Sequence, residues 1–185
     1  MKGIVFTEFL DMVEGQFGLE ITEKIIERSA LPNGGAYTSV GTYDHGELAG
    51  MVGHLSAITG IAPPALVRAF GEHMFPILAA AHPHVVAGVN SCFGLLEIVE
   101  SGIHKEVRKL YPNAELPEIQ CRRLDASRLE LTYRSTRPFA DLAEGLLRGC
   151  ARHFGESVAL DREDLPVAAG QWVRFTLTAA QPGRN

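Results

Sequence analysis

Apolar residues recur at the spacing of a helix through the first third of the chain. Between residues 4 and 17 they fall on one side and the acidic residues mostly on the other, which predicts an amphipathic helix. A second helix is expected over about 20–30. After a glycine-rich connector, Asp44 is placed to cap a third helix from about 45 to 59.

Prolines and a long apolar stripe mark the next helical segments. Pro63 and Pro64 break the chain and restart it as a helix, and we expect Pro76 to interrupt that helix. The longest helical candidate then runs from Val89 to Tyr111, where the letters YPN end it. The first two thirds of the chain are therefore expected to be mostly helical.

The apolar period changes to two in the last third of the chain, which is typical of strands. One helix, over about 138–155, interrupts this region, and the tail QPGRN is expected to fray. The predicted fold class is α+β: a mostly helical N-terminal part, then a four-stranded antiparallel sheet with an intervening helix. The strands are expected over about 117–125, 129–136, 156–164 and 171–179.

The charge balance of the chain excludes some partners. Seventeen Lys and Arg against 22 Asp and Glu give a net charge of −5, which does not offer the basic face that a nucleic-acid partner needs. Acids at Glu8, Asp11 and Glu14 interrupt the apolar start, which therefore predicts neither a signal peptide nor a membrane-spanning helix. We expect a cytoplasmic protein without a membrane or nucleic-acid partner.

Cysteines and histidines give little sign of a metal cluster. Cys92, Cys121 and Cys150 are too few and too widely spaced for a disulfide framework, and we expect buried thiols. His82 and His84 flank a proline in AHPHVV. They are expected to be surface residues of a turn, with a metal role as the alternative.

The stretch LTYRSTRPF places Tyr133, Ser135 and Arg137 at every second position, so in a strand they share one face. One interpretation is the solvated face of an ordinary strand. The other is a donor array for a carboxylate or phosphate, because a guanidinium can hold such a group with two parallel hydrogen bonds.

His104 follows Ile103 near the edge of the apolar stripe of the long helical candidate. Alone, such a histidine is commonly a satisfied core or boundary residue. Combined with the donor array on the sheet, it suits a ligand with a metal at its centre and acidic groups at its edge, which describes haem.

The sequence resembles the haem nitric oxide/oxygen binding (H-NOX) family, which includes the sensor domain of soluble guanylate cyclase. The resemblance rests on MKGIVFTEFLDMVE at the start, on IHKEVRKLYPNAELP and on the YxSxR motif. It runs the length of the chain, since AEGLLRGCARHFG and the final strands also fit. It implies one domain over 1–185, with a helical lobe of about 1–64, a lobe of about 65–181 that carries the haem-binding helix and sheet, and haem buried between them.

The resemblance also implies roles for individual residues. His104 would be the proximal ligand of a haem b without a covalent link, in agreement with the absence of a CxxCH motif. Tyr133, Ser135 and Arg137 would hold the haem propionates, and Pro117 would pack against the porphyrin. The residues implied on the distal side are Val5, Phe9, Met74, Leu142 and Leu146.

Members of the family that hold oxygen stably use a distal tyrosine supported by a tryptophan and an asparagine. The matching positions here are Leu142, Phe9 and Met74, none of which is a polar donor. The resemblance therefore implies a sensor that binds nitric oxide, and also carbon monoxide, and excludes oxygen. Loosening of the iron bond to His104 would signal to a separate chain, a histidine kinase or a cyclic-di-GMP enzyme.

Other classes of protein are less well supported by the residues. Asp141 and Glu144 near His153 can be read as an acid–base cluster, but their helical positions predict a solvated face, and we expect no enzyme. A haem-binding redox or oxygen sensor and a thiol-based redox sensor remain alternatives. Phe139 and Asp141 stand where some family members carry zinc-binding cysteines, although Cys150 could be oxidised if it is exposed.

Overall fold

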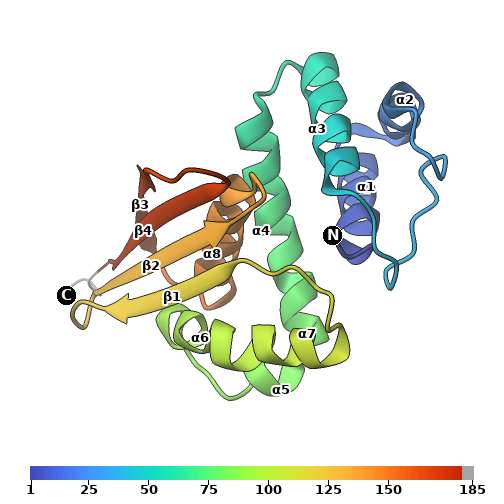
Figure 1. Cartoon of the computed structure of the whole chain (residues 1–185). Coiled ribbons are helices and arrows are strands. Elements are labelled where there is room, and N and C mark those ends of the chain that lie inside the picture. Colours follow the sequence, from blue (N-terminus) through green and yellow to red (C-terminus); the bar gives the residue numbers. More distant parts are fainter. Residues whose placement is uncertain (181–185) are drawn as a thin grey trace.

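Three helices form the first part of the chain in a computed structural model that describes residues 1–180 (Figure 1). They are α1 (Ile4–Phe17), α2 (Leu19–Ser29) and α3 (His45–Thr59), each within one residue of its predicted bounds. The predicted cap is confirmed, because the Asp44 side chain accepts a hydrogen bond from the backbone N–H of Gly46 at 2.7 Å. The predicted fraying of QPGRN falls outside the described residues.

Helix α4 (Pro63–Ala81) is one element of 19 residues, so the predicted interruption at Pro76 is wrong. A proline inside a helix removes one backbone hydrogen bond, but burial of α4 on two sides outweighs that loss. Met74 and Phe75, just before the proline, are buried in two different cores. Within residues 1–180 no helix alone is long and apolar enough to cross a membrane; α3 and α4 meet that test only as a pair bent by 114°.

The segment after α4 is not the single helix predicted over 89–111. It comprises α5 (Pro83–Val86), α6 (Cys92–Ile98), the π-helical η1 (Val99–His104) and α7 (Lys105–Leu110). Ile98 and Ile103 lie five residues apart, yet both pack against the same buried cluster, the one that also contains Leu129 and Leu131 of the sheet. The wider π turn brings such a pair to one side, which an α-helix would not do.

The predicted sheet is confirmed, and with it the α+β class. It consists of β1 (Glu118–Arg123), β2 (Arg128–Ser135), β3 (Val158–Leu165) and β4 (Gln171–Ala179). All pairs are antiparallel, in the order β1-β2-β4-β3. Helix α8 (Ala140–His153) falls between β2 and β3 in the chain and lies behind the sheet, beside α4 (Figure 1).

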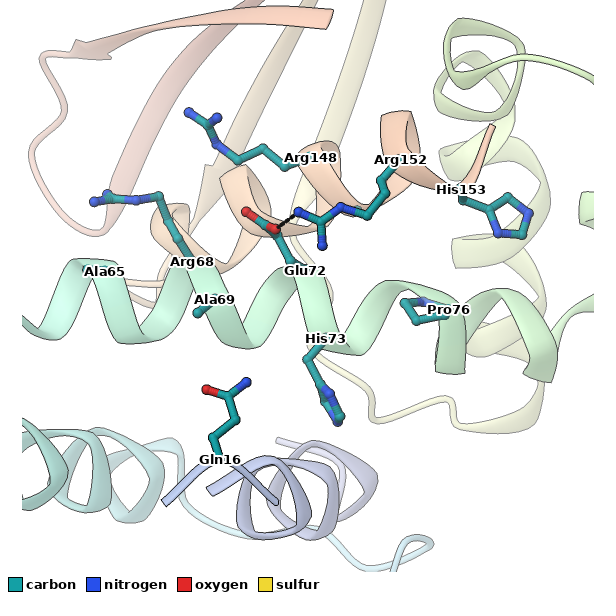
Figure 2. Close-up of a pocket in the computed structure, with 11 residues that line it drawn as sticks. Gln16, Ala65, Arg68, Ala69, Glu72, His73, Pro76, Arg148, Arg152 and His153 are labelled. Carbon is teal, nitrogen blue, oxygen red and sulfur yellow. Dashed lines mark hydrogen bonds and ion pairs between the residues drawn. The ribbon is translucent and has the colours of Figure 1, made fainter. Parts of the chain in front are cut away.

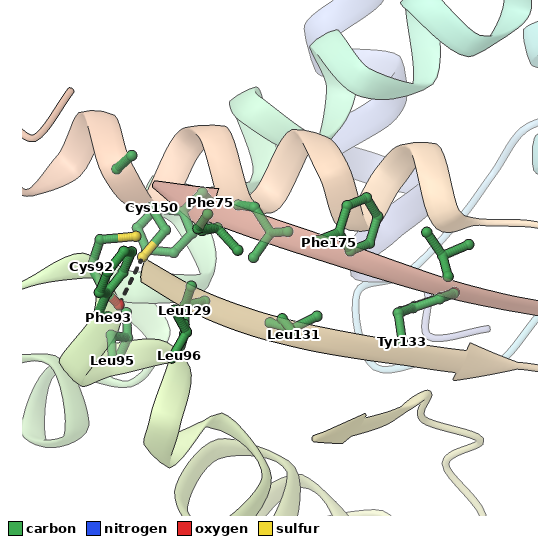
Figure 3. Packing of buried hydrophobic residues seen from close by; sticks show 14 of the residues in the cluster. Phe75, Cys92, Phe93, Leu95, Leu96, Leu129, Leu131, Tyr133, Cys150 and Phe175 are labelled. Atoms are coloured by element: carbon green, nitrogen blue, oxygen red, sulfur yellow. Dashed lines mark hydrogen bonds between the residues drawn. The ribbon is translucent and has the colours of Figure 1, made fainter. Parts of the chain in front are cut away.

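Two buried clusters hold these elements together. The sheet core joins α6 and α8 to one face of the sheet and contains Tyr133 (Figure 3). The helical core lies among α1 to α4 and includes Phe139. Leu146 of α8 packs against both clusters. The helices α4 and α8 meet very closely, since a Cβ atom added to Gly145 would lie 2.1 Å from the carbonyl oxygen of Arg68.

Candidate functional site

His104 is the last residue of the π-helical segment, and its side chain is only 12% exposed. Its Nδ1 lies 2.8 Å from Oε2 of Glu100. Burial lowers the pKa of His104, although the Glu100 carboxylate opposes this shift. We assign the single ring proton to Nδ1, because a carboxylate can only accept. The lone pair of Nε2 is then available to a metal, which is how histidine ligands are usually oriented.

Glu100 and Arg108 complete this arrangement, and the sequence analysis missed both. Arg108 donates from Nη2 to Oε1 of Glu100 at 2.6 Å, so the carboxylate binds one partner with each oxygen. Burial raises the pKa of Glu100, but the hydrogen bonds from Arg108 and His104 outweigh burial and lower it overall. The spacing of four from Glu100 to His104 and from His104 to Arg108 was the available signal.

The strand residues of the YxSxR motif form a second polar group. Tyr133 is buried on the face of β2 that also carries Leu129 and Leu131, so the interpretation of a solvated face is wrong. Burial raises the pKa of Tyr133, although Ser135 and Arg137 nearby oppose this shift, and the phenol stays protonated. The hydroxyl oxygen of Ser135 accepts a hydrogen bond of 3.0 Å from the backbone N–H of Arg137.

Arg137 lies two residues beyond the end of β2, and its side chain is 17% exposed. Its guanidinium is paired with the carboxylate of Glu115, in the connector between α7 and β1. Pro117, half-buried, ends the same connector directly before β1. The structure thus places a largely buried cation beside Ser135, already in contact with a carboxylate.

The five residues predicted on the distal side gather at the helical core. Phe9 and Met74 are buried in it, and Val5 and Leu142 pack against it. Leu146 packs against this core and against the sheet core, which contains Tyr133 and also receives Ile103, the neighbour of His104. The predicted distal wall is therefore entirely apolar, and Leu146 connects it to the sheet core.

The chemistry of these side chains fits a haem. The neutral His104, backed by Glu100, is a typical axial ligand. Arg137 suits a propionate, and Tyr133 and Ser135 add hydroxyl groups beside it. The apolar side chains of Phe9 and Met74 suit a porphyrin face.

A separate pocket of about 690 Å³ opens between α1, α4 and α8 (Figure 2). It contains none of the predicted haem residues. Its arginines already have carboxylate partners: Arg152 contacts Glu72 at 2.5 Å, and Arg68 and Arg148 bind the acids of α8 outside the pocket. The residues that line it are Gln16, Ala65, Arg68, Ala69, Glu72, His73, Pro76, Arg148, Gly149, Arg152 and His153.

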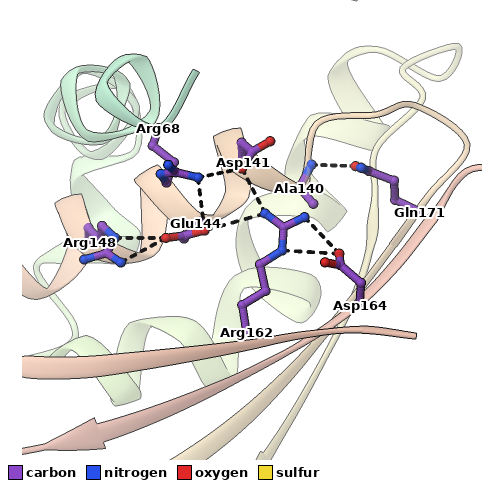
Figure 4. Close-up of polar contacts among 8 residues, drawn as sticks. All are labelled: Arg68, Ala140, Asp141, Glu144, Arg148, Arg162, Asp164 and Gln171. Atoms are coloured by element: carbon purple, nitrogen blue, oxygen red, sulfur yellow. Dashed lines mark hydrogen bonds and ion pairs between the residues drawn. The ribbon is translucent and has the colours of Figure 1, made fainter. Parts of the chain in front are cut away.

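Asp141 and Glu144 do not lie on a solvated face, and that prediction is wrong. Glu144 is only 7% exposed, and three arginines surround the two acids (Figure 4). Arg68 and Arg162 each donate to Asp141 at 2.9 Å, and Arg148 donates to Glu144 at 2.9 Å. This network ties α8 to α4 and β3, and its ion pairs offset the cost of burying the carboxylates.

The remaining histidines do not build a catalytic or metal cluster within residues 1–180. His153 packs against the rings of Phe75 and Phe154 and so does not join the acids of α8. His84 is exposed as predicted and lies 3.0 Å from the carboxylate of Glu106. The same prediction is wrong for His82, whose side chain is only 16% exposed and turns towards Glu106. No group of three or more His, Cys, Asp or Glu side chains in this part of the chain is arranged to hold a metal ion.

The prediction of buried thiols is confirmed for Cys92 and Cys150, while Cys121 is half-buried. The Cys150 thiol donates towards the backbone oxygen of Cys92, with 3.9 Å between the two atoms (Figure 3). The neighbouring Cys92 thiol and burial raise the pKa of Cys150, and burial raises the pKa of Cys121 to about 12. All three cysteines are free.

Comparisons with known proteins identify the family. The model of the Haem-NO-binding family matches residues 2–162. No curated protein matched the sequence. Among solved structures, the Fe(II) unliganded H-NOX protein from K. algicida is 37% identical and has a TM-score of 0.90, with 98% of each chain covered.

Two further structures record gas-bound states of such proteins. The H-NOX protein from S. oneidensis in the Fe(II)NO state is 29% identical, with a TM-score of 0.88 and coverage of 98% of this chain and 100% of that one. The IWP-051-bound H-NOX from Shewanella woodyi in the Fe(II)CO state is 41% identical, with a TM-score of 0.84 and coverage of 100% and 97%. Domains of this family are haem-based gas sensors and are not catalytic. The chain belongs to the Haem-NO-binding, or H-NOX, family.

Proposed function

We propose that this protein is a nitric oxide sensor that holds a haem b through His104. The main support for this proposal is the 2.8 Å hydrogen bond between Nδ1 of His104 and Glu100, which leaves Nε2 available for iron. The haem, when bound, supplies the ferrous iron to which nitric oxide or carbon monoxide binds. The sequence contains no CxxCH motif, so retention of the haem depends on side chains.

In this proposal each part of the haem has residues of the chain that contact it. Tyr133 and Ser135 donate hydrogen bonds to the propionates, and Arg137 neutralises their charge. Pro117 packs against the porphyrin. The apolar side chains on the distal side exclude water from the gas site; they are Val5, Phe9, Met74, Leu142 and Leu146.

Selection against oxygen would come from the side chains of Phe9, Met74 and Leu142. Bound dioxygen carries partial negative charge, which a buried donor stabilises by about 1–3 kcal/mol. None of these three residues can donate, and all three lie in or against the helical core. Nitric oxide needs no donor, so an apolar wall favours nitric oxide over oxygen.

The signal would pass through the helix that carries His104. His104 ends η1, and α7 continues directly from it, so any shift of the imidazole moves α7. We propose that a separate chain reads this shift, either a histidine kinase or a cyclic-di-GMP enzyme. We also propose a cytoplasmic location, where the three free thiols stay reduced.

Haem titration of two histidine variants tests the assignment of the ligand. His104→Ala should retain haem poorly and with an altered Soret band, because the axial nitrogen is lost. His84→Ala is the matched control, since His84 also has a carboxylate partner but its side chain is 64% exposed. Equal haem binding and equal spectra in the two variants would exclude His104 as the ligand.

Hydrogen exchange tests the signalling step without the partner. In wild type, nitric oxide should change the exchange of backbone amides in residues 99–110. In His104→Gly supplied with imidazole, the iron keeps a nitrogen ligand that is no longer tied to the backbone, and the change should disappear. An unchanged response in that variant would disprove coupling through His104.

A further inference from the structure

The cation assigned to the propionates is already paired with a carboxylate of its own chain. The guanidinium of Arg137 donates from Nη2 to Oε2 of Glu115. The two partners differ in exposure: the Arg137 side chain is 17% exposed and that of Glu115 is 69% exposed. Glu115 therefore reaches inward from the surface to a cation that is otherwise shielded from water.

Because of the position of Glu115 in the chain, its pair with Arg137 joins two separate elements. It lies in the connector between α7, which follows His104, and β1, which follows Pro117. The pair with Arg137 joins this connector to the end of β2, where Ser135 fixes the backbone of Arg137. One ion pair therefore closes the connector over the end of the sheet that carries Tyr133, Ser135 and Arg137.

The helical lobe holds the same connector at its other end. The Lys2 ammonium lies 4.0 Å from the centre of the Tyr111 ring, the first residue after α7, and donates to the carbonyl oxygen of Val40 at 2.6 Å. Near Tyr111 the connector is therefore held by groups other than Glu115. Opening at Glu115 requires only the middle of the connector to move.

We propose that Glu115 is an internal competitor of the haem propionates for Arg137. In the haem-free chain Glu115 pairs with Arg137 and closes the connector. When haem enters, a propionate takes the place of the Glu115 carboxylate, one anion replacing another, and Glu115 turns to solvent. The pair therefore slows haem uptake and stabilises the haem-free form. This inference rests on the proposed haem site.

Removing the charge of Glu115 should affect only the haem-free form. Glu115→Gln keeps the size of the side chain but does not compete as an anion, so haem uptake should become about two- to fivefold faster, the range expected for a partly exposed ion pair. The melting temperature should fall for haem-free Glu115→Gln and stay unchanged for the haem-loaded variant. Glu118→Gln is the control, because Glu118 is also exposed but pairs with Gln120.

The experiment follows the Soret absorbance as haem is added to the haem-free proteins. These are wild type, Glu115→Gln, Glu118→Gln, Arg137→Ala and the double variant that combines Arg137→Ala with Glu115→Gln. Faster uptake in Glu115→Gln alone, and no effect of Glu115→Gln when Arg137 is absent, is the expected result. Wild type that takes up no haem would overturn the proposed function itself. Wild-type uptake with an unchanged or slower rate in Glu115→Gln, or equal destabilisation of both forms, would overturn the competitor role alone.

Discussion

Glu100 and His104 occupy one π-helical segment and are joined by a hydrogen bond of 2.8 Å to Nδ1 of the imidazole. The carboxylate fixes both the tautomer and the orientation of the ring, and Arg108 fixes the carboxylate in turn. Nε2 of His104, the atom that we propose binds iron, is therefore oriented by contacts with residues of the same continuous helical segment.

Replacing Glu100 should weaken haem retention although Glu100 does not touch the haem. Glu100→Gln removes the charge that strengthens the imidazole as a ligand, and we expect about tenfold faster haem loss to an acceptor such as haem-free myoglobin. Glu97→Gln is the control, because Glu97 lies three residues earlier and pairs with Arg123 at 2.7 Å. Equal rates of haem loss in the two variants would contradict the role of Glu100.

Removing Arg137 should also accelerate haem loss. Arg137→Ala deletes a charge-assisted hydrogen bond worth about 1.5–3 kcal/mol, so haem loss should become roughly ten- to a hundredfold faster. Arg134→Ala is the control, since Arg134 is exposed on the same strand and lies 6.0 Å from the centre of the Trp172 ring. Full haem occupancy in Arg137→Ala at unchanged stability would contradict the assignment of Arg137 to the propionates and leave the YxSxR motif a structural role only.

The sequence predicted the elements whose patterns are local. Amphipathic spacing located α1 and alternation located all four strands, because burial of one face decides both patterns, while the Asp44 cap located the start of α3. The π turn before His104 was missed, since one inserted residue leaves no clear periodic signal. The continuation of α4 past Pro76 was missed because packing from remote parts of the chain decides it.

The same distinction applies to the candidate site. Tyr133, Ser135 and Arg137 could be grouped from their spacing, because the strand sets their common face. The pairing of Glu115 with Arg137 and the burial of Glu144 depend on partners distant in the sequence. Such contacts follow from the assembled fold, and polarity along one helix or loop does not predict them.

The thiols should react slowly, which tests the alternative of a thiol-based sensor. With its pKa raised to about 12, Cys121 stays protonated at pH 8, and its thiolate population is about a thousandfold below that of a thiol with an ordinary pKa. Labelling by iodoacetamide should rise about tenfold for each pH unit while the protein stays folded. A cysteine labelled at pH 8 as fast as a free thiol would restore the redox alternative.

The seam between α4 and α8 should not tolerate a methyl group. Gly145→Ala places a Cβ atom 2.1 Å from the carbonyl oxygen of Arg68, and we expect the free energy of unfolding to fall by about 1–3 kcal/mol. Gly53→Ala in α3 is the control, because a Cβ atom there meets nothing within 4 Å and should stabilise the helix by about 0.5–1 kcal/mol. Urea unfolding of both variants measures the difference, and equal effects would contradict the close packing of the seam.

The most direct test is the absorption spectrum of the reduced, haem-loaded protein, recorded first in air and then with nitric oxide. We predict that air produces no stable oxygen complex, because Phe9, Met74 and Leu142 offer no hydrogen-bond donor, and that nitric oxide shifts the Soret band at once. A stable oxygen spectrum in air would contradict the apolar gas site. A colourless protein that takes up no added haem would contradict the whole account.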